Sequence, residues 1–411
     1  MNNKESLVYK KKKTIYDSKL LCALLYLIFV KPDYFGEIEF LDRPFFWATF
    51  FATAFLMIAI IFSKKWTFAF WWTIIFFGII FISTIMNGGE LYKYCRTEFN
   101  IVGMCFMFDL WMKKSPITLL SASRILQVYI YINLITVILY PDGMFSSDLY
   151  SANWFLGYKN PQIRTILPIV SLSILYSYWK YNRINLSSYI LIFVSLVTFL
   201  LIDSSTALVG FILFILLMVV FSNGIIPYPK ILNISTSLLA VLALGIAIIF
   251  FSIQDNYETF FNDVLHRETD FTSRLTIWYD SVYRIIKQPL LGYGYMITDD
   301  FQAWYGFKQA THPHNFYLYV LIRGGFILLT VVIGGFLYAN KIVMRYIEYP
   351  FAKVITFTLV CLMLMGLTEA LTGTVMLYPM FILAMNAEEL ANIGFQIPAI
   401  SKKNKIKKSV I

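Results

Sequence analysis

The sequence predicts an all-α, polytopic integral membrane protein of about twelve transmembrane helices, with a large extracytoplasmic loop before the last helices. Hydrophobic residues make up 59% of the 411 residues, charged residues make up only 14%, and the mean hydropathy is positive. Apolar runs of about 17 residues or more recur along the chain, and in lipid such runs form helices because backbone polar groups must be satisfied within the segment. This composition excludes an ordinary soluble domain.

The first predicted helix, Leu20–Val30, follows a basic tail at residues 1–19 that we assign to the cytoplasm. Its four consecutive lysines, Lys10–Lys13, could be mistaken for the basic region of a secretory signal. However, Lys31 and Pro32 stand where a signal peptide would have a small-residue cleavage site, and more apolar runs follow. We therefore expect an uncleaved first helix.

Residues 20–252 are predicted to hold helices 1–9, with an outer loop near 141–164, and residues 314–388 to hold helices 10–12. Between these groups lies the large extracytoplasmic loop, 253–313, and a basic cytoplasmic tail, 389–411, ends the chain. After the first helix, the apolar runs that we assign as spans are Pro44–Phe62, Trp66–Met86, Phe99–Met112, Ile117–Tyr140, Thr165–Trp179, Leu186–Ile202, Ala207–Phe221, Ile231–Ser252, Asn315–Leu337, Phe351–Leu371 and Val375–Ala387.

The distribution of charge supports a topology with both termini in the cytoplasm. Of the 34 lysines and arginines, 21 fall in predicted cytoplasmic segments and 11 in predicted outer segments, while the outer loops carry 17 of the 24 acidic residues. Such a bias is typical of multi-pass membrane proteins. The basic net charge therefore indicates membrane topology and contact with anionic lipids, and it does not indicate a nucleic-acid partner.

The remaining composition favours neither a disulfide framework nor a metal site. Cys22, Cys105 and Cys361 fall in predicted spans and only Cys95 lies in an outer loop, without a CxxC or Cys/His spacing. The chain also has no internal repeat of fixed period, so a transporter built from two similar halves gains no support.

Two outer loops are long enough to carry function. The shorter one, Pro141–Arg164, has a basic end at Lys159 and Arg164. The longer one, about sixty residues that end at Pro313, is the only predicted segment large enough to fold over the membrane.

Within the longer loop, Thr272 or Ser273 is positioned to cap an amphipathic helix that ends before Pro289. Its polar side carries Arg274 in the first turn, where backbone N–H groups and a guanidinium could together hold an anion. The alternative is a set of solvated charges on a helix that lies on the bilayer. The polar side also includes Ser281 and Arg284, and the apolar positions are Leu275, Trp278, Tyr279, Val282, Ile285 and Ile286.

A glycine turn and a histidine pair follow this helix. Gly292 and Gly294 could let the backbone approach a ligand, although the motif is neither a Walker loop nor a Rossmann turn. His312 and His314 stand at the next predicted membrane boundary. A histidine there can act as a base, ligate a metal or cap a helix start, and we favour a catalytic or substrate-contacting His314 because further metal ligands do not accompany the pair.

Together these residues resemble the O-antigen polymerase and ligase superfamily. The similarity is carried by Arg274-x3-Trp278, by Pro289-x2-Gly292-x-Gly294, and by His314-Asn315-x2-Leu318 leading into Gly324-Gly325. The earlier loop from Trp154 to Asn160 also resembles the corresponding loop of that superfamily. One departure is the break at Asp203–Thr206, which has no arginine where the superfamily often has one.

The resemblance implies a glycosyltransferase of the bacterial cytoplasmic membrane whose active site faces the extracytoplasmic side. It implies an undecaprenyl-diphosphate-linked oligosaccharide as donor, no metal and no cofactor. It also implies a flippase and a chain-length regulator as partners. In the polymerase, the glycan passes to the non-reducing end of another lipid-linked repeat unit. In the ligase, it passes to a different acceptor.

The resemblance assigns roles to particular side chains. A diphosphate leaving group without metal calls for arginines, and Arg164, Arg274 and Arg284 are available. We expect His314 to be the catalytic base. The expected substrate contacts are Asn315, Trp278, His312, Lys159, Gly292, Gly294 and Arg323.

Arg323 has an alternative interpretation. A charge inside a span is costly and usually functional, which favours a substrate contact. Glu369, near the outer end of a later span, could instead pair with Arg323.

Three functional hypotheses remain open at this stage. We favour a polysaccharide repeat-unit polymerase, for O-antigen, capsule or exopolysaccharide. A ligase of the same superfamily would differ in its acceptor. A flippase or transporter would place buried charges along a central path and would not need a sixty-residue outer loop.

Overall fold

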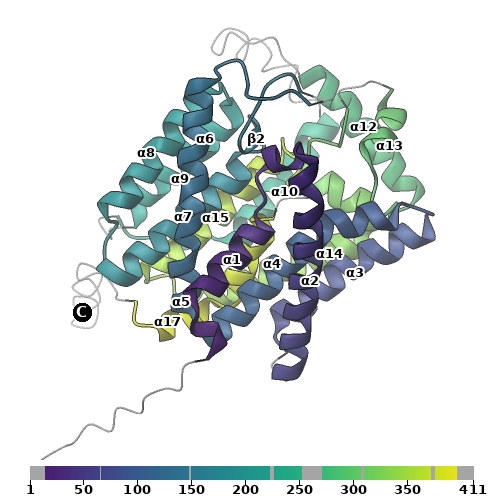
Figure 1. Cartoon of the computed structure of the whole chain (residues 1–411). Coiled ribbons are helices and arrows are strands. Elements are labelled where there is room, and N and C mark those ends of the chain that lie inside the picture. Colours follow the sequence, from purple (N-terminus) through teal and green to yellow (C-terminus); the bar gives the residue numbers. More distant parts are fainter. Residues whose placement is uncertain are drawn as a thin grey trace, which may run out of the picture.

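The computed structural model describes residues 14–64, 66–147, 150–222, 226–251, 271–306, 310–371 and 375–395. This part of the chain is a bundle of helices with one two-stranded hairpin (Figure 1). The predicted all-α membrane class is confirmed at that level. Most of the predicted loop before residue 271, and both predicted basic tails except residues 14–19 and 389–395, lie outside the described residues.

The helices and strands follow the chain in a simple order. The first half contains η1 (Ile15–Asp17), α1 (Lys19–Phe29), η2 (Asp33–Gly36), α2 (Glu39–Ser63), α3 (Phe68–Met86), α4 (Leu91–Lys114), α5 (Pro116–Ala122), η3 (Ser123–Leu126), α6 (Gln127–Leu139), β1 (Asn153–Trp154) and β2 (Gly157–Tyr158). The second half contains α7 (Ile163–Tyr181), α8 (Leu186–Leu201), α9 (Ser205–Phe221), α10 (Ile234–Phe251), α12 (Phe271–Lys287), α13 (Thr298–Tyr305), α14 (Phe316–Met344), α15 (Pro350–Met365), α16 (Leu377–Met385) and α17 (Ala387–Asn392).

Each of the twelve predicted apolar segments contains a helix. By length and composition, four helices of the described chain are suited to cross a membrane: Glu39–Ser63, Phe68–Met86, Pro116–Leu139 and Phe316–Met344. Five more apolar helices are shorter. The count of twelve spans therefore stays a prediction.

One predicted boundary is wrong in a way that affects function. We expected a span over Phe351–Leu371, but α15 ends at Met365 and residues 366–371 leave the helix. This short non-helical segment is central to the candidate site, and we call it the post-α15 segment.

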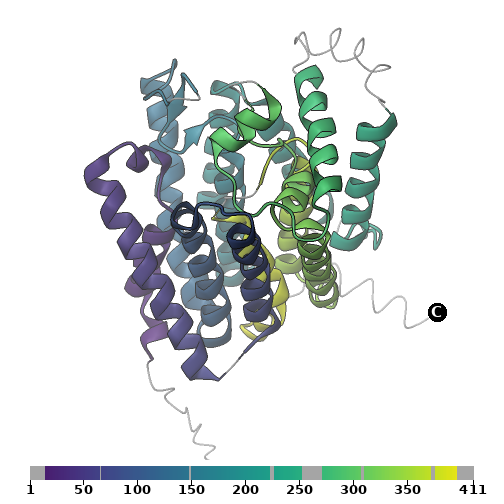
Figure 2. The same cartoon turned by 90° about the vertical axis from the view of Figure 1, so that its right-hand side faces the viewer.

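Helix α15 lies inside the bundle with other helices around it. Almost every residue of α15 and α16 is buried, and α15 packs against α7, α9 and α10. By contrast, α2 exposes large apolar side chains such as Phe51 and Phe62, and α8 exposes Phe193. Figure 2 shows α2 at one flank and α10 with α12 at the other. Exposed apolar side chains on outer helices are what a lipid-facing surface requires.

The helix α14 is broken at Gly325, whose φ of 62° and ψ of −161° are not helical. The turn at Pro289–Gly294 forms four backbone hydrogen bonds with the groups that the break in α14 leaves unpaired. Tyr293 and Gly294 donate to the carbonyls of Ile322 (2.7 Å) and Arg323 (3.1 Å). In return, Phe326 and Ile327 donate to Pro289 (2.7 Å) and Leu290 (3.3 Å). A helix break at membrane depth persists only where other groups satisfy its backbone.

The glycines of this turn permit that close approach. A Cβ on Gly292 would lie 2.3 Å from the Ile322 carbonyl oxygen, and one on Gly294 would lie 2.4 Å from the Thr84 backbone nitrogen. The expectation that Gly292 and Gly294 admit a ligand is therefore corrected: their missing side chains make room for the backbone of α14 and α3.

The hairpin of β1 and β2 is held by buried amides. Asn133 on α6 accepts from the Leu156 backbone N–H (2.9 Å) and donates to Gln162 (2.8 Å), and Gln162 donates to the Gly157 carbonyl (2.9 Å). Gln162 precedes the first residue of α7. This network therefore sets the start of α7, where Arg164 lies in the first turn.

The hairpin, α12 and α13 share one end of the bundle, which is the upper end in Figure 1. The start of α1 and the helix α17 lie at the lower end. The long connections that the sequence assigns to one side of the membrane thus gather at one end.

Candidate functional site

A cavity of about 790 Å³ opens at the upper end, and we call it the upper cavity. Its wall comes from segments far apart in sequence: η2, the hairpin, the start of α7, the start of α13 and the histidine loop. The lining residues with polar or aromatic side chains include Lys31, Asp33, Glu37, Lys93, Tyr150, Tyr158, Arg164, Tyr295, Asp299, Thr311, His312 and Tyr319.

The post-α15 segment connects this cavity to the predicted site residues through four of its backbone carbonyls. Its carbonyls accept the Phe316 backbone N–H at Gly366 (2.7 Å) and the Asn315 side chain at Leu367 (3.0 Å). They also accept the guanidinium of Arg274 at Thr368 (3.1 Å) and that of Arg164 at Ala370 (2.5 Å). Residues from three separate regions of the chain therefore converge on six residues.

Both guanidinium groups are held by neutral carbonyls, so their positive charge is not cancelled by an ion pair. Within the described residues, neither Arg164 nor Arg274 forms an ion pair with a carboxylate. Glu369 lies between the two carbonyls in sequence and is buried, and its Oε1 has no hydrogen-bond partner in the described structure. Burial raises the pKa of Glu369, while the charges of Arg274 and Arg164 oppose the rise.

The histidine loop has an unusual backbone. His314 has φ of 48°, a region that non-glycine residues seldom occupy, and its N–H donates to Nδ1 of His312 (3.1 Å). The two rings lie 4.1 Å apart between centroids. Strain of this kind persists where surrounding contacts hold it, and functional sites are common places for it.

The electrostatic setting keeps both rings neutral at pH 7. Burial, and secondarily the charge of Arg274, lowers the pKa of His314 to about 4. Burial and the neighbouring His314 hold the pKa of His312 well below its usual range. Because Nδ1 of His312 accepts a hydrogen bond, a neutral His312 carries its proton on Nε2 and can donate from there. A neutral His314 can accept a proton.

Helix α12 holds the histidine loop in place through a hydrogen bond. The indole N–H of Trp278 donates to the Pro313 carbonyl (2.9 Å), and Ser281 bonds the Tyr305 hydroxyl (2.7 Å). At the start of α14, Asn315 caps the helix by accepting from Tyr317 and Leu318. These contacts fix the direction in which His314 and Asn315 leave the membrane helix.

Comparison with known families supports the same part of the chain. Residues 190–333 match the family model described as O-antigen ligase. This match supports the resemblance of the chain to the O-antigen polymerase and ligase superfamily. None of the curated proteins matches it.

The match indicates glycan transfer of the O-antigen ligase or polymerase type by a multi-pass inner-membrane protein. The matched region runs from α8 into α14, so it contains Arg274, the glycine turn and His314. It does not contain Arg164 or the post-α15 segment, which the tertiary structure adds to the site.

The structure separates two predicted substrate contacts from this cluster. Arg284 lies on α12 ten residues after Arg274, about 15 Å along the helix, and its guanidinium stacks on Trp304 at 4.6 Å. Lys159 bonds the carbonyl of Asp203 (3.4 Å) at the break between α8 and α9. Neither residue lines the upper cavity or bonds the post-α15 segment. Arg274 and His314 do not line the cavity either, but Arg274 bonds the post-α15 segment and His314 contacts His312, which does line it.

Two expectations about α12 are wrong. Trp278 was expected to contact the substrate, but it is only 2% exposed and packs inside the protein. Ser281 was expected on the polar side and is buried as well. The buried side of α12 packs on α13 and α14, while Tyr279, Tyr283 and Ile286 are exposed.

Arg323 is paired with a residue that we did not predict. Its guanidinium bonds the carboxylate of Glu98 on α4, and both side chains are 2% exposed. The rings of Tyr295 and Tyr319 lie 5.5 Å from its guanidinium carbon. The expected pairing of Arg323 with Glu369 is therefore wrong, and its expected contact with substrate is replaced by a buried ion pair.

Sequence reasoning missed the acidic and aromatic wall of the upper cavity. Asp33 and Glu37 follow the first helix, Tyr150 lies in the shorter loop, and Asp299 starts α13. None of them belongs to a recognisable motif, and in the sequence they are marked only by the preference of polar residues for the ends of apolar runs. Among the described residues, no three His, Cys, Asp or Glu side chains come together as a metal site.

Proposed function

We propose that the protein is a repeat-unit polymerase, which transfers a glycan from undecaprenyl diphosphate to the non-reducing-end sugar of another lipid-linked repeat unit. The observation that carries this proposal is the pair of arginines, Arg164 and Arg274, held by neutral carbonyls beside His312 and His314. A carrier diphosphate needs such cations, and an acceptor hydroxyl needs such a base.

Arg164 and Arg274 bind the diphosphate of the donor. Each guanidinium uses part of its donor set on a backbone carbonyl and keeps further N–H groups for phosphate oxygens. Arginines in a largely desolvated site stabilise the charge that develops on the leaving diphosphate. His312 lines the upper cavity together with Arg164 and donates from Nε2 to the substrate there.

His314 acts as the general base. As the acceptor hydroxyl oxygen forms its bond to the anomeric carbon, the bond from that carbon to the phosphate oxygen breaks. The electron pair leaves with undecaprenyl diphosphate, and the hydroxyl proton passes to His314. Positioned bases of this kind contribute roughly 10²–10⁴-fold to the rate. Asn315 orients the histidine loop through its bond to Leu367.

The acceptor glycan occupies the remaining wall of the upper cavity. Carboxylates at Asp33 and Glu37 can accept hydrogen bonds from sugar hydroxyls, and Tyr150 and Tyr158 present aromatic surface. A volume of about 790 Å³ is within the usual range for a small-ligand site.

We place this site on the extracytoplasmic side and both termini in the cytoplasm. The lysine and arginine bias supports this orientation. A flippase then supplies lipid-linked repeat units to the same leaflet, and a chain-length regulator acts on the product.

The family model's description favours a second candidate, a ligase that transfers the glycan to a different acceptor. The two differ only in the acceptor, which the upper cavity would bind in either case. The product therefore has to decide between them.

The test is a gel of lipid-linked glycan from cells that lack the gene, complemented with wild type or His314→Ala. We expect single repeat units on the carrier in both the deletion and the variant, with the variant protein present at normal level. Long chains that remain on the carrier would indicate the ligase. Loss of lipid-linked repeats from the outer leaflet would indicate a flippase, and normal long chains from His314→Ala would remove the base from the mechanism.

A further inference from the structure

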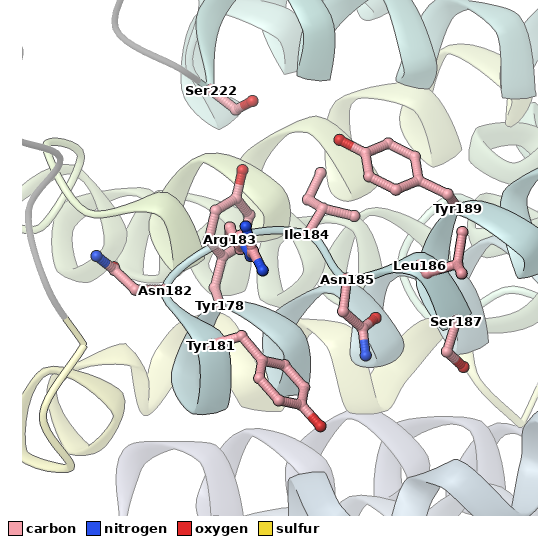
Figure 3. A pocket seen from close by; sticks show the side chains of 10 residues that line it. All are labelled: Tyr178, Tyr181, Asn182, Arg183, Ile184, Asn185, Leu186, Ser187, Tyr189 and Ser222. Carbon is pink, nitrogen blue, oxygen red and sulfur yellow. The ribbon is translucent and has the colours of Figure 1, made fainter.

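A second pocket lies at the opposite end of the bundle, where α7 connects to α8. It has a volume of about 670 Å³ (Figure 3), and we call it the lower pocket. Its wall is formed by the last turn of α7, the connector, the first turn of α8 and the end of α9. The lining residues are Tyr178, Tyr181, Asn182, Arg183, Ile184, Asn185, Leu186, Ser187, Tyr189 and Ser222.

We propose that the lower pocket binds the phosphate headgroup of an anionic membrane phospholipid. The proposal goes beyond glycan transfer and does not depend on it. Four features of the pocket support it: the sign of its charge, an unsatisfied hydroxyl, a rigid connector and an adjoining apolar surface.

The polar lining can donate hydrogen bonds and carries positive charge only. Arg183 supplies a guanidinium, and Asn185 and Ser187 supply further donors, while no carboxylate is present among the ten lining residues. Within the described residues, Arg183 forms no ion pair. A phosphate matches the planar donor set of an arginine.

Tyr178 provides the second observation. Its side chain is 6% exposed, and its hydroxyl forms no hydrogen bond of acceptable geometry with the described residues, although the Ser222 hydroxyl lies near enough to interact with it. A buried polar group without a partner is costly, so an external group that completes it gains affinity. Figure 3 shows the Tyr178 hydroxyl directed toward Ser222 at the edge of the pocket. The Ser222 hydroxyl already bonds the carbonyl of Met218.

The connector is held in place before any ligand arrives. Ser177 donates to the carbonyl of Arg183 (2.8 Å) and accepts from the N–H of Asn185 (2.6 Å). Asn185 also caps α8 by accepting from Ser188 (3.0 Å). The donors around the pocket are thus preorganised, which lowers the entropic cost of binding.

The pocket continues into an exposed apolar face, which is why a lipid fits better than a free anion. Leu186 is 73% exposed, Tyr189 is 56% exposed and Phe193 is 66% exposed along α8. Acyl chains of a bound lipid would cover this face. The lower pocket also lies among the basic segments that the sequence assigns to the cytoplasmic leaflet, where anionic lipids concentrate.

The test uses the purified full-length protein in neutral detergent, titrated with short-chain phosphatidylglycerol, short-chain phosphatidylcholine or inorganic phosphate. Binding is followed by native mass spectrometry and by the shift in melting temperature. We expect phosphatidylglycerol to bind and stabilise, with weaker responses to the other two ligands. An equal response to phosphatidylcholine, or binding of phosphate without preference for the lipid, would overturn the proposal.

Three variants localise the effect. Arg183→Gln should weaken phosphatidylglycerol binding about tenfold or more, because a charge-assisted hydrogen bond is lost. Tyr178→Phe should weaken it about threefold to tenfold without lowering the melting temperature of the lipid-free protein, because the hydroxyl has no well-formed hydrogen bond to the described residues to lose. Lys180→Gln is the matched control: Lys180 stacks on Tyr176 and Tyr181 and does not line the pocket. Equal losses in Lys180→Gln and Arg183→Gln would mean diffuse surface attraction and would refute a site.

Discussion

The protein holds two partly buried arginines and one fully buried arginine in different ways. Beside the upper cavity, Arg164 and Arg274 donate to backbone carbonyls of the post-α15 segment. Deeper in the bundle, Arg323 donates to the carboxylate of Glu98. A carbonyl positions a guanidinium without cancelling its charge, whereas a carboxylate cancels it. In the proposed function, the first arrangement leaves cations available for an anionic substrate, whereas the second joins α14 to α4.

The largest expected effect concerns the buried ion pair of Arg323 and Glu98. Arg323→Met leaves the Glu98 carboxylate buried without its partner, which should lower the free energy of unfolding by about 3–5 kcal/mol. The double variant with Glu98→Gln should recover most of that loss because no isolated charge remains. Denaturant unfolding of the purified proteins measures both. Equal stability of wild type and Arg323→Met would show that the ion pair of Arg323 and Glu98 does not stabilise the fold.

The next effect concerns Arg164 and Arg274, the two arginines held by carbonyls. It should appear in the activity of the enzyme and not in its stability. Arg274→Ala should lower turnover roughly 10²–10³-fold, in the range found when one donor to developing charge is removed, while the protein accumulates normally. Lys287→Ala is the control, since Lys287 lies on the same helix and stacks on the exposed Tyr283. If Arg274→Ala unfolds the protein as Arg323→Met does, the distinction between the two regions fails.

A smaller effect tests the glycine turn that supports both regions. Gly294→Ala places a Cβ against the Thr84 backbone at a φ of 79°, whereas Gly306→Ala has a φ of 80° and open space. The two variants share the cost of the backbone conformation, so their difference isolates the close approach. We expect Gly294→Ala to be less stable than Gly306→Ala by about 1–3 kcal/mol. Equal melting temperatures would mean that the turn does not need the contact with α3.

The smallest effect is a shift in pH dependence. His314 must be neutral to accept a proton, so kcat/KM should fall as the pH drops through its pKa of about 4, and not near the ordinary value of 6.5. Arg274→Gln removes a positive charge and should move this acid limb upward, although burial, the larger cause, keeps it below 6.5. A pH profile of residual activity provides the measurement. An unchanged limb would mean that Arg274 does not act on His314.

Much of the fold could be predicted because hydrophobic runs are a local property. All twelve predicted segments contain helices, and the helix predicted between Thr272 and Pro289 is present as α12. The errors come from contacts between distant residues. The end of α15 was misplaced because Leu367, Ala370 and Leu371 continue the apolar run and no proline marks the end of the helix. The face of α12 was misjudged because α13 and α14 cover Trp278, a partner that the sequence does not reveal.

The candidate site was predicted in part for the same reason. His314, Arg274 and Asn315 stand in recognisable local patterns, so they could be named before their surroundings were known. The convergence of Arg164 on Ala370 spans more than 200 residues, and the pairing of Arg323 with Glu98 spans more than 220. A sequence places no constraint on such partners beyond their charge.

The sequence by itself determined that the chain enters the membrane, that the candidate site residues lie in polar connections, and that the chain resembles a superfamily of glycan transferases. Only the tertiary structure decided which arginines lack a carboxylate partner among the described residues. It also decided that the turn at Pro289–Gly294 supplies the backbone hydrogen bonds at the break in α14. The physical reason is that apolar periodicity is encoded over neighbouring residues. The partner of a buried charge or of an unsatisfied backbone group depends on which helices pack together.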